Sequence, residues 1–235
     1  MTAKEILSEL KPLGSASIRK VLLNHGIREP VYGVKVSDLQ VIRKRIKKDY
    51  QLALDLYDTG VYDAMYLAGL IADDARMTRK DLQHWVDGAY CRGLCGSTVA
   101  WVAAGGPFAW EMALKWIDSK TANEAACGWA TLGSWVSVTP DAQLDTKAFE
   151  ALLRRVEKSI HTAPDVVRYQ MNGFVIAVGA YVLPLSALAI QTGERIGPVT
   201  ADLGDTECSI PFAPDYIRKI EARGSLGKKR KTAKC

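Results

Sequence analysis

Apolar side chains recur every three or four residues along most of the chain, which is the spacing of an amphipathic helix. The first such stripe consists of Ile6, Leu7, Leu10 and Leu13. The pattern predicts about a dozen helices of roughly 10–18 residues joined by short loops. Only residues 199–203 and 208–211 have a briefly extended pattern, so strands contribute little.

Regular helices joined by short loops predict an all-α fold of stacked antiparallel helix pairs, an α-solenoid. No exact motif recurs at a fixed period, and a globular helical bundle is the competing architecture. No Pro/Ser-rich linker divides the chain, so we expect a single domain over residues 1–223. Residues 224–235 are basic, and we expect them to form a flexible C-terminal tail.

The net charge is concentrated in two segments. The chain has 31 basic and 26 acidic side chains, a formal charge of +5. Residues 215–235 hold eight basic and two acidic side chains, a net +6, so the other 214 residues sum to −1. Within that nearly neutral part, five of the six residues from 43 to 48 are basic, whereas residues 49–91 carry eight acids and three bases. Charge therefore predicts one cationic helix face and one cationic tail, not a cationic protein.

The bulk sequence argues against a membrane or secreted protein. The longest apolar run, residues 174–190, is interrupted by Gly179, Pro184 and Ser186, and it falls short of the roughly 18–20 uninterrupted residues of a membrane span. The N-terminus contains acids and no apolar signal core, so we expect a cytoplasmic protein.

The cysteines do not form a metal-binding pattern. Cys91 and Cys95 are four residues apart, but no second Cys/His pair with zinc spacing follows them. We therefore expect reduced thiols, no metal and no cofactor.

An ordered series of weak motifs across residues 5–180 resembles the DNA alkylation repair (AlkD-like) family of the HEAT-like repeat DNA glycosylase superfamily. The motifs lie at Gly33–Leu39, Leu52–Tyr57, Tyr62–Ala68, Ala113–Ser119 and Ala126–Ala130. Met171–Gly179 and Pro214–Ile220 are similar to a bacterial subgroup of that family. The resemblance implies HEAT-like repeats curved around DNA, and its active members excise N3- and N7-alkylated purines.

The expected catalytic positions depart from the family pattern. Cleavage of an N-glycosidic bond develops positive charge on the sugar, which a nearby carboxylate stabilises. The resemblance implies an aspartate near Gly96, a tryptophan near Arg92 and an arginine pair where residues 123–126 read Asn-Glu-Ala-Ala. Asp87 is the only nearby acid and the sole catalytic candidate. We therefore expect this protein not to be an efficient glycosylase.

Candidate DNA contacts are basic side chains grouped on helix faces or in the tail, where they could neutralise phosphates. They are Arg43, Lys44, Lys47, Lys48, Arg92, Arg154, Arg155, Lys158, Arg168, Lys228, Lys229, Arg230 and Lys231. A merely solvated charged face is the alternative reading for each group. Trp101 and Trp135 are candidates for an aromatic groove lining, whereas Trp116 and Trp129 lie among apolar neighbours and are expected in the core.

The sequence thus predicts a monomer that binds damaged or distorted duplex DNA through its phosphate backbone, without base-specific readout. Two other functions are compatible with it. One is an active alkylpurine DNA glycosylase. The other is a protein-interaction scaffold, which an apolar or acidic concave surface would favour.

Overall fold

The computed structural model describes residues 1–206 and 208–234 of the chain. The described residues form thirteen α-helices and no strand, which confirms the all-α prediction. The helices are α1 (Ala3–Leu13), α2 (Ala16–Asn24), α3 (Val36–Ile46), α4 (Tyr50–Tyr57), α5 (Tyr62–Ile71), α6 (Arg79–Gly88), α7 (Ala100–Gly105), α8 (Ala109–Ile117), α9 (Ala122–Val138), α10 (Thr146–Ser159), α11 (Asp165–Tyr181), α12 (Ser186–Ile196) and α13 (Ala213–Ala222).

Side-chain caps fix where several helices begin. Thr2, Asp49, Thr78 and Asp145 accept backbone N–H groups at the first turns of α1, α4, α6 and α10. Each such cap contributes about 1 kcal/mol, because it satisfies a donor that has no partner within the helix. Ser15 precedes α2 without making this bond.

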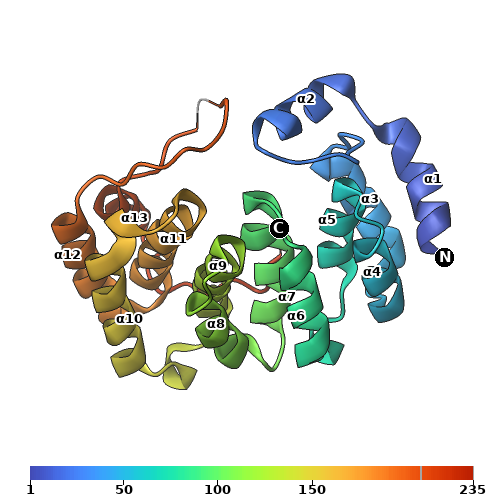
Figure 1. Cartoon of the computed structure of the whole chain (residues 1–235). Coiled ribbons are helices and arrows are strands. Elements are labelled where there is room, and N and C mark those ends of the chain that lie inside the picture. The colour runs from blue at the N-terminus through green and yellow to red at the C-terminus, as the bar shows by residue number, and fades with distance from the viewer. Residues whose placement is uncertain (207, 235) are drawn as a thin grey trace.

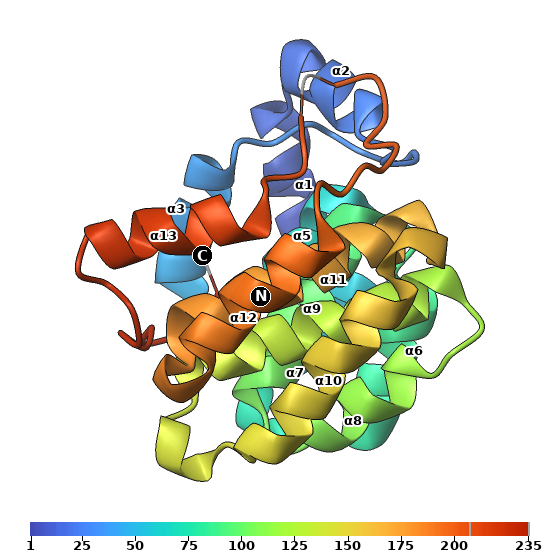
Figure 2. The ribbon, with the colours of Figure 1, turned by 90° about the vertical axis from the view of Figure 1, so that its left-hand side faces the viewer.

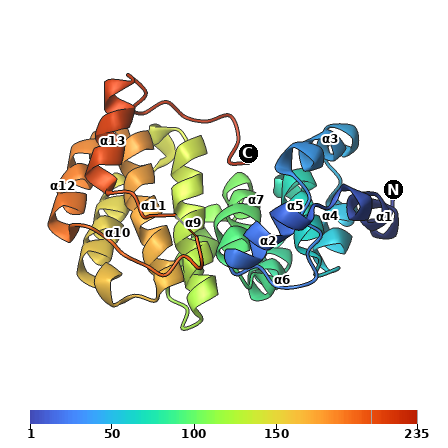
Figure 3. The same ribbon diagram turned by 90° about the horizontal axis from the view of Figure 1, so that it is seen from above.

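The helices stack in two layers. α5, α7, α9 and α11 lie side by side, and α4, α6, α8 and α10 cover them (Figure 1, Figure 3). Contact between the layers is close: a Cβ added to Gly128 of α9 would come within 2.7 Å of the backbone nitrogen of Ile117 in α8. The first residues of α9 and α11 share one edge of the inner layer, and the last residues of α5, α7 and α9 share the other. We name these the N-terminal edge and the C-terminal edge.

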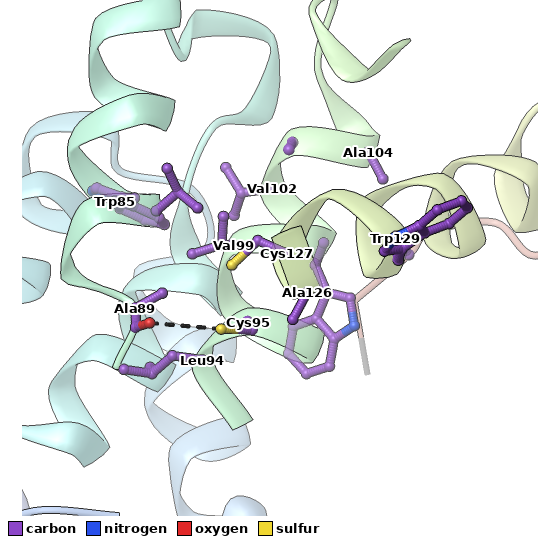
Figure 4. Close-up of a cluster of buried hydrophobic side chains, with 14 of the residues drawn as sticks. Trp85, Ala89, Leu94, Cys95, Val99, Val102, Ala104, Ala126, Cys127 and Trp129 are labelled. Carbon is purple, nitrogen blue, oxygen red and sulfur yellow. Dashed lines mark hydrogen bonds between the residues drawn. The ribbon is translucent and has the colours of Figure 1, made fainter. Parts of the chain in front are cut away.

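Large aromatic side chains fill the space between the layers. Trp85, Trp116, Trp129, Phe149 and Phe174 are fully buried, as predicted for Trp116 and Trp129. Figure 4 shows Cys95 and Cys127 packed between Trp85 and Trp129. These thiols are part of the apolar core and take no part in the functional argument.

The apolar helices are short or bent. Among the described residues no single helix is long and apolar enough to cross a membrane. The helix α11 and the segment Leu183–Ile196 meet that test only as a pair bent by 115°.

The structure docks residues 224–234 on the solenoid, where the sequence predicts a flexible tail over residues 224–235, and Cys235 lies outside the described residues. Residues 224–234, which we name the strap, run along the C-terminal edge (Figure 1, Figure 3). Backbone N–H groups of Gly227 and Arg230 donate to the carbonyls of Ala180 in α11 and Ser137 in α9, at 2.8 and 2.7 Å. The last carbonyls of a helix lack partners and carry negative partial charge, so a basic segment is stabilised there.

Two lysines complete the docking of the strap. Lys229 Nζ lies 2.9 Å from the Val136 carbonyl and 2.7 Å from the Asp141 carboxylate. Lys234 Nζ lies 2.8 Å from the Ala72 carbonyl, directly after α5, and 2.6 Å from the Asp74 carboxylate. The strap thereby joins the C-terminal repeats to the N-terminal ones.

A second segment bridges the two halves at the opposite edge. Residues 197–206 leave α12 and reach α2 (Figure 1, Figure 2). Gly204 packs directly on the Asn24 carbonyl, where an added Cβ would lie 2.3 Å from the oxygen. Arg168 of α11 holds this segment through a 2.7 Å hydrogen bond from Nη1 to the Thr200 carbonyl.

Candidate nucleic-acid interface

The position expected for a catalytic aspartate has no charge. Gly96 lies in a π-helical turn, Leu94–Val99, immediately before α7. A Cβ on Gly96 would come within 2.5 Å of Nε2 of Gln170, so the amide of this buried α11 side chain covers the position. A neutral amide cannot balance the positive charge that develops on a sugar during glycosidic cleavage.

Arg92 is held in place by two side chains. Its Nη2 lies 3.2 Å from Nδ1 of His25, and its guanidinium lies 4.8 Å from the ring centroid of Tyr169. Its buried Nη1 has no hydrogen-bond partner among the described residues. A guanidinium that is stacked and partly unsatisfied is a preorganised donor for an anion.

The cleft around Arg92 also contains carboxylates. This cleft of about 320 Å³ is lined by residues of α2, the start of α11 and the bridging segment, including Asp165 and Asp202. Asp165 lies 3.5 Å from Arg168, and Asp202 accepts the backbone N–H of Gly204 at 2.8 Å. Both carboxylates thus have structural partners.

Asp87, the catalytic candidate, lies outside the Arg92 cleft. It is exposed on α6, where it accepts a 2.8 Å hydrogen bond from Nε2 of Gln83. It lines a different cleft, of about 420 Å³, together with Asp58 and His84. The structure does not bring it together with Arg92 or Gly96.

Four cations line a cleft of about 620 Å³ at the N-terminal edge, which we name the α10 cleft. They are Lys120, Arg154, Arg155 and Lys158, and no carboxylate is among the described lining residues. Arg155 is anchored, because it donates to Asp118 at 2.6 Å and to the Ile117 carbonyl at 2.8 Å. Arg154 lies 3.8 Å from Glu150, a loose exposed pair. The ammonium groups of Lys120 and Lys158 are left to interact with a ligand.

A second cationic cleft, of about 760 Å³, lies at the C-terminal edge between α3 and the strap, and we name it the α3 cleft. Its charged lining residues are Arg43, Lys44, Lys47, Lys48, Lys231, Lys234 and Asp74. Lys234 is paired with Asp74, Lys48 lies 3.2 Å from Asp73, and Arg43 donates to Gln40 at 3.0 Å. The structure thus brings together two groups of predicted cations that are about 180 residues apart in sequence.

Of the remaining predicted DNA-contacting residues, two are bonded within the protein and two are exposed. Arg168 bonds the carbonyls of Ala163 and Thr200, and Lys229 bonds α9, so both are engaged within the protein. Lys228 and Arg230 are exposed on the outer side of the strap.

The two aromatic groove candidates are both packed against other rings. Trp101 is 6% exposed and meets the ring of Tyr66 edge-on at 5.5 Å. Trp135 packs on Trp110 and Phe149, toward α8 and α10. Trp101 is thus buried and Trp135 is half-buried, and their role in lining a groove stays a prediction.

Several residues of these sites have no signal in the sequence. Lys120 is an isolated lysine before α9, and its neighbourhood with Lys158 depends on how α9 packs beside α10. His25 and Gln170 reach the catalytic region from 67 and 74 residues away in sequence. Packing alone brings these residues together.

Comparisons with known proteins agree with this geometry. The profile of the family described as DNA alkylation repair enzyme matches residues 6–201. Two uncharacterized proteins are similar over 229 residues, 95% of this chain and 99% of each relative. They are Lin0241 of Listeria innocua serovar 6a, 29% identical, and Lmo0209 of Listeria monocytogenes serovar 1/2a, 28% identical.

A solved structure superposes on the whole of this chain with a TM-score of 0.92 at 33% identity, and the whole of that chain is covered too. It is described as a new family of proteins related to the HEAT-like repeat DNA glycosylases with affinity for branched DNA structures. This match confirms the HEAT-like solenoid. The family profile, which covers most of the chain, shows that the protein belongs to the DNA alkylation repair family.

Proposed function

We propose that this protein binds branched or otherwise distorted DNA through the phosphate backbone and is not an efficient alkylpurine glycosylase. The observation that carries the proposal is the charge of the two edge clefts, whose described lining residues include ten cations and a single carboxylate. Phosphate contacts from lysine and arginine supply most non-specific DNA affinity. Support also comes from the solved relative, whose description names branched DNA.

Recognition of shape rather than base sequence follows from the chemistry of the clefts. Lysine ammonium groups on exposed helix faces contact phosphates without sequence information, whereas base readout needs groups that enter a groove. The described clefts are lined by cations together with apolar and hydroxyl side chains, and Trp101 and Trp135 pack against other rings. The described lining residues of the two clefts carry ten cations and one carboxylate, and this charge favours DNA over a protein partner.

The positions of the carboxylates argue against efficient glycosylase chemistry. The position expected for the catalytic aspartate is Gly96, which has no carboxylate, and Asp87 lines a different cleft. Asp165 pairs with Arg168, and Asp202 accepts the backbone N–H of Gly204. We therefore propose that DNA is bound without efficient base excision, by a monomer.

Two measurements test this function. Fluorescence anisotropy with a labelled four-way junction and a linear duplex, titrated from about 50 to about 200 mM salt, should show affinity that falls steeply as salt rises. Incubation of alkylated DNA with excess protein should release no 3-methyladenine or 7-methylguanine above the uncatalysed rate. No binding to any DNA at low salt would reject the first half of the proposal, and enzymatic base release the second.

A further inference from the structure

We propose that the α10 cleft and the α3 cleft hold the phosphates of two different arms of one branched DNA. The inference rests on the proposed function and adds how a branch is distinguished from a linear duplex. The supporting observations are the separation of the two clefts, the lysine side chains that lack partners in each cleft, and the positions of the bridging segment and the strap.

The clefts lie at opposite ends of the same helix. Ala122 and Ala125, in the first turn of α9, line the α10 cleft, and Val138, its last residue, lines the α3 cleft. With a rise of 1.5 Å per residue, the two ends of α9 are about 24 Å apart. Figure 3 shows α9 running between the two edges of the solenoid. The clefts are therefore separate sites on one rigid body.

Each cleft has cations that are free for phosphate. Among the described residues, the side chains of Lys120 and Lys158 in the α10 cleft make no hydrogen bond or ion pair. The same is true of the side chains of Lys44, Lys47 and Lys231 in the α3 cleft. The other cations of the clefts are anchored by protein partners. Both sites thus combine fixed positive charge with mobile ammonium groups, as phosphate-contacting surfaces do.

The strap increases the positive charge of the C-terminal edge. Helix ends carry negative partial charge there, and the carboxylates of Asp74 and Asp141 add to it. Lys234 and Lys229 neutralise these carboxylates from the strap, which leaves the exposed Lys231 as an extra cation facing α3. The strap therefore adds to the positive charge that Arg43, Lys44, Lys47 and Lys48 of α3 already bring to this edge.

One straight duplex cannot readily occupy both clefts. A duplex lying along α9 would meet the bridging segment at the N-terminal edge, where Gly204 packs on Asn24, and the strap at the C-terminal edge. A duplex placed against one edge would have to bend sharply to reach the other, although DNA stays stiff over about 150 base pairs. Two arms that diverge from a branch point can approach both edges without such bending.

Bivalent attachment predicts the size of the preference. Once one arm is bound, the second arm is held close to its cleft, and such linkage raises affinity by roughly 10²–10⁴-fold without new types of contact. A linear duplex uses one cleft at a time, so the loss of either cleft costs it little.

The test compares three double variants of the full chain. Lys120→Gln with Lys158→Gln alters the α10 cleft, and Lys44→Gln with Lys231→Gln alters the α3 cleft. Lys80→Gln with Lys147→Gln is the matched control, because both lysines are exposed and neither lines a described cleft. Dissociation constants are measured by anisotropy for a four-way junction and for a linear duplex of one of its arms, with urea unfolding to check that each variant is folded.

We expect either cleft variant to lose about tenfold or more in junction affinity, to lose about twofold or less in duplex affinity, and to reduce the junction salt slope by about 2. The control should change neither. Equal losses for junction and duplex, or wild-type binding of both with equal affinity, would overturn the inference and leave the proposed function standing. Wild-type protein that binds neither DNA would instead reject the proposed function itself.

Discussion

Replacing Lys234 by methionine removes the ammonium group that fastens the end of the strap to the N-terminal repeats. The side chains of Lys234 and Asp74 are only 5% and 15% exposed, and their charged atoms lie 2.6 Å apart. Methionine keeps the length and the apolar stem but leaves the Asp74 carboxylate without its cation. The Ala72 carbonyl loses its lysine donor as well.

The magnitude follows from the burial of this pair. Breaking a buried ion pair by removing one partner costs about 3–5 kcal/mol, because the other charge stays desolvated. The strap can leave its site, however, so the chain avoids this cost by undocking. A change of about 3 kcal/mol in the docking equilibrium raises the undocked fraction more than 100-fold.

Limited trypsin digestion measures the undocked fraction, since cleavage follows the population of the open form when opening and closing are fast. Cleavage at Lys229–Lys231 should be about 100-fold faster in Lys234→Met than in wild type. Lys228→Met is the control, because the Lys228 side chain is exposed and makes no hydrogen bond or ion pair among the described residues. Equal cleavage rates in Lys234→Met and Lys228→Met would refute the structural role given to the ion pair.

The same variant has a defined pH dependence. Burial raises the pKa of Asp74 above its ordinary value of 3.8, while Lys234 and Lys48 act to lower it and Asp73 acts to raise it. Without Lys234 this pKa rises further, so the folded state holds the proton more tightly than the unfolded state does. Folded Asp74 then gains stability as pH falls toward 3.8. Urea unfolding should show a smaller gap between Lys234→Met and wild type near about pH 4.5 than at about pH 7.

Three further outcomes follow from the structure. Lys47 ends α3 with φ 67°, a left-handed value that costs a lysine about 1 kcal/mol, so Lys47→Gly should raise urea stability by about that amount while lowering the junction salt slope by about 1. Asp63 is 1% exposed and accepts two backbone N–H groups at 2.6 and 2.7 Å, so Asp63→Ala should cost about 3 kcal/mol in urea unfolding. Arg155→Ala should lower stability by about 1–2 kcal/mol because its two anchoring bonds are lost, whereas Lys158→Gln should weaken DNA binding at unchanged stability.

Local pattern was sufficient to predict the helices and the burial of Trp116 and Trp129, because each depends on neighbours within one or two turns. It was also sufficient to find most cleft cations, since a run such as residues 43–48 places several on one helix face. The family resemblance added the curvature and the DNA expectation.

The docking of the strap could not be predicted from local sequence. A basic, glycine-containing segment has the composition of a solvated tail, and its partners at Ala72 and Asp74 lie about 160 residues away in sequence. What orders it is the row of helix ends along the C-terminal edge, and this row exists only after the solenoid has formed. For the same reason local pattern does not predict the ring partners of Trp135, because Trp110 and Phe149 come from other helices.

The salt dependence of junction binding by the wild-type protein tests the central claim most directly. Five cleft lysines are free of partners among the described residues, and each phosphate neutralised contributes about 0.9 to the slope of log affinity against log salt. The account predicts a slope of about −4 to −5 for a four-way junction, and a shallower slope with weaker binding for a linear duplex. A junction affinity that does not change with salt, or a junction slope no steeper than that of the duplex, would contradict it.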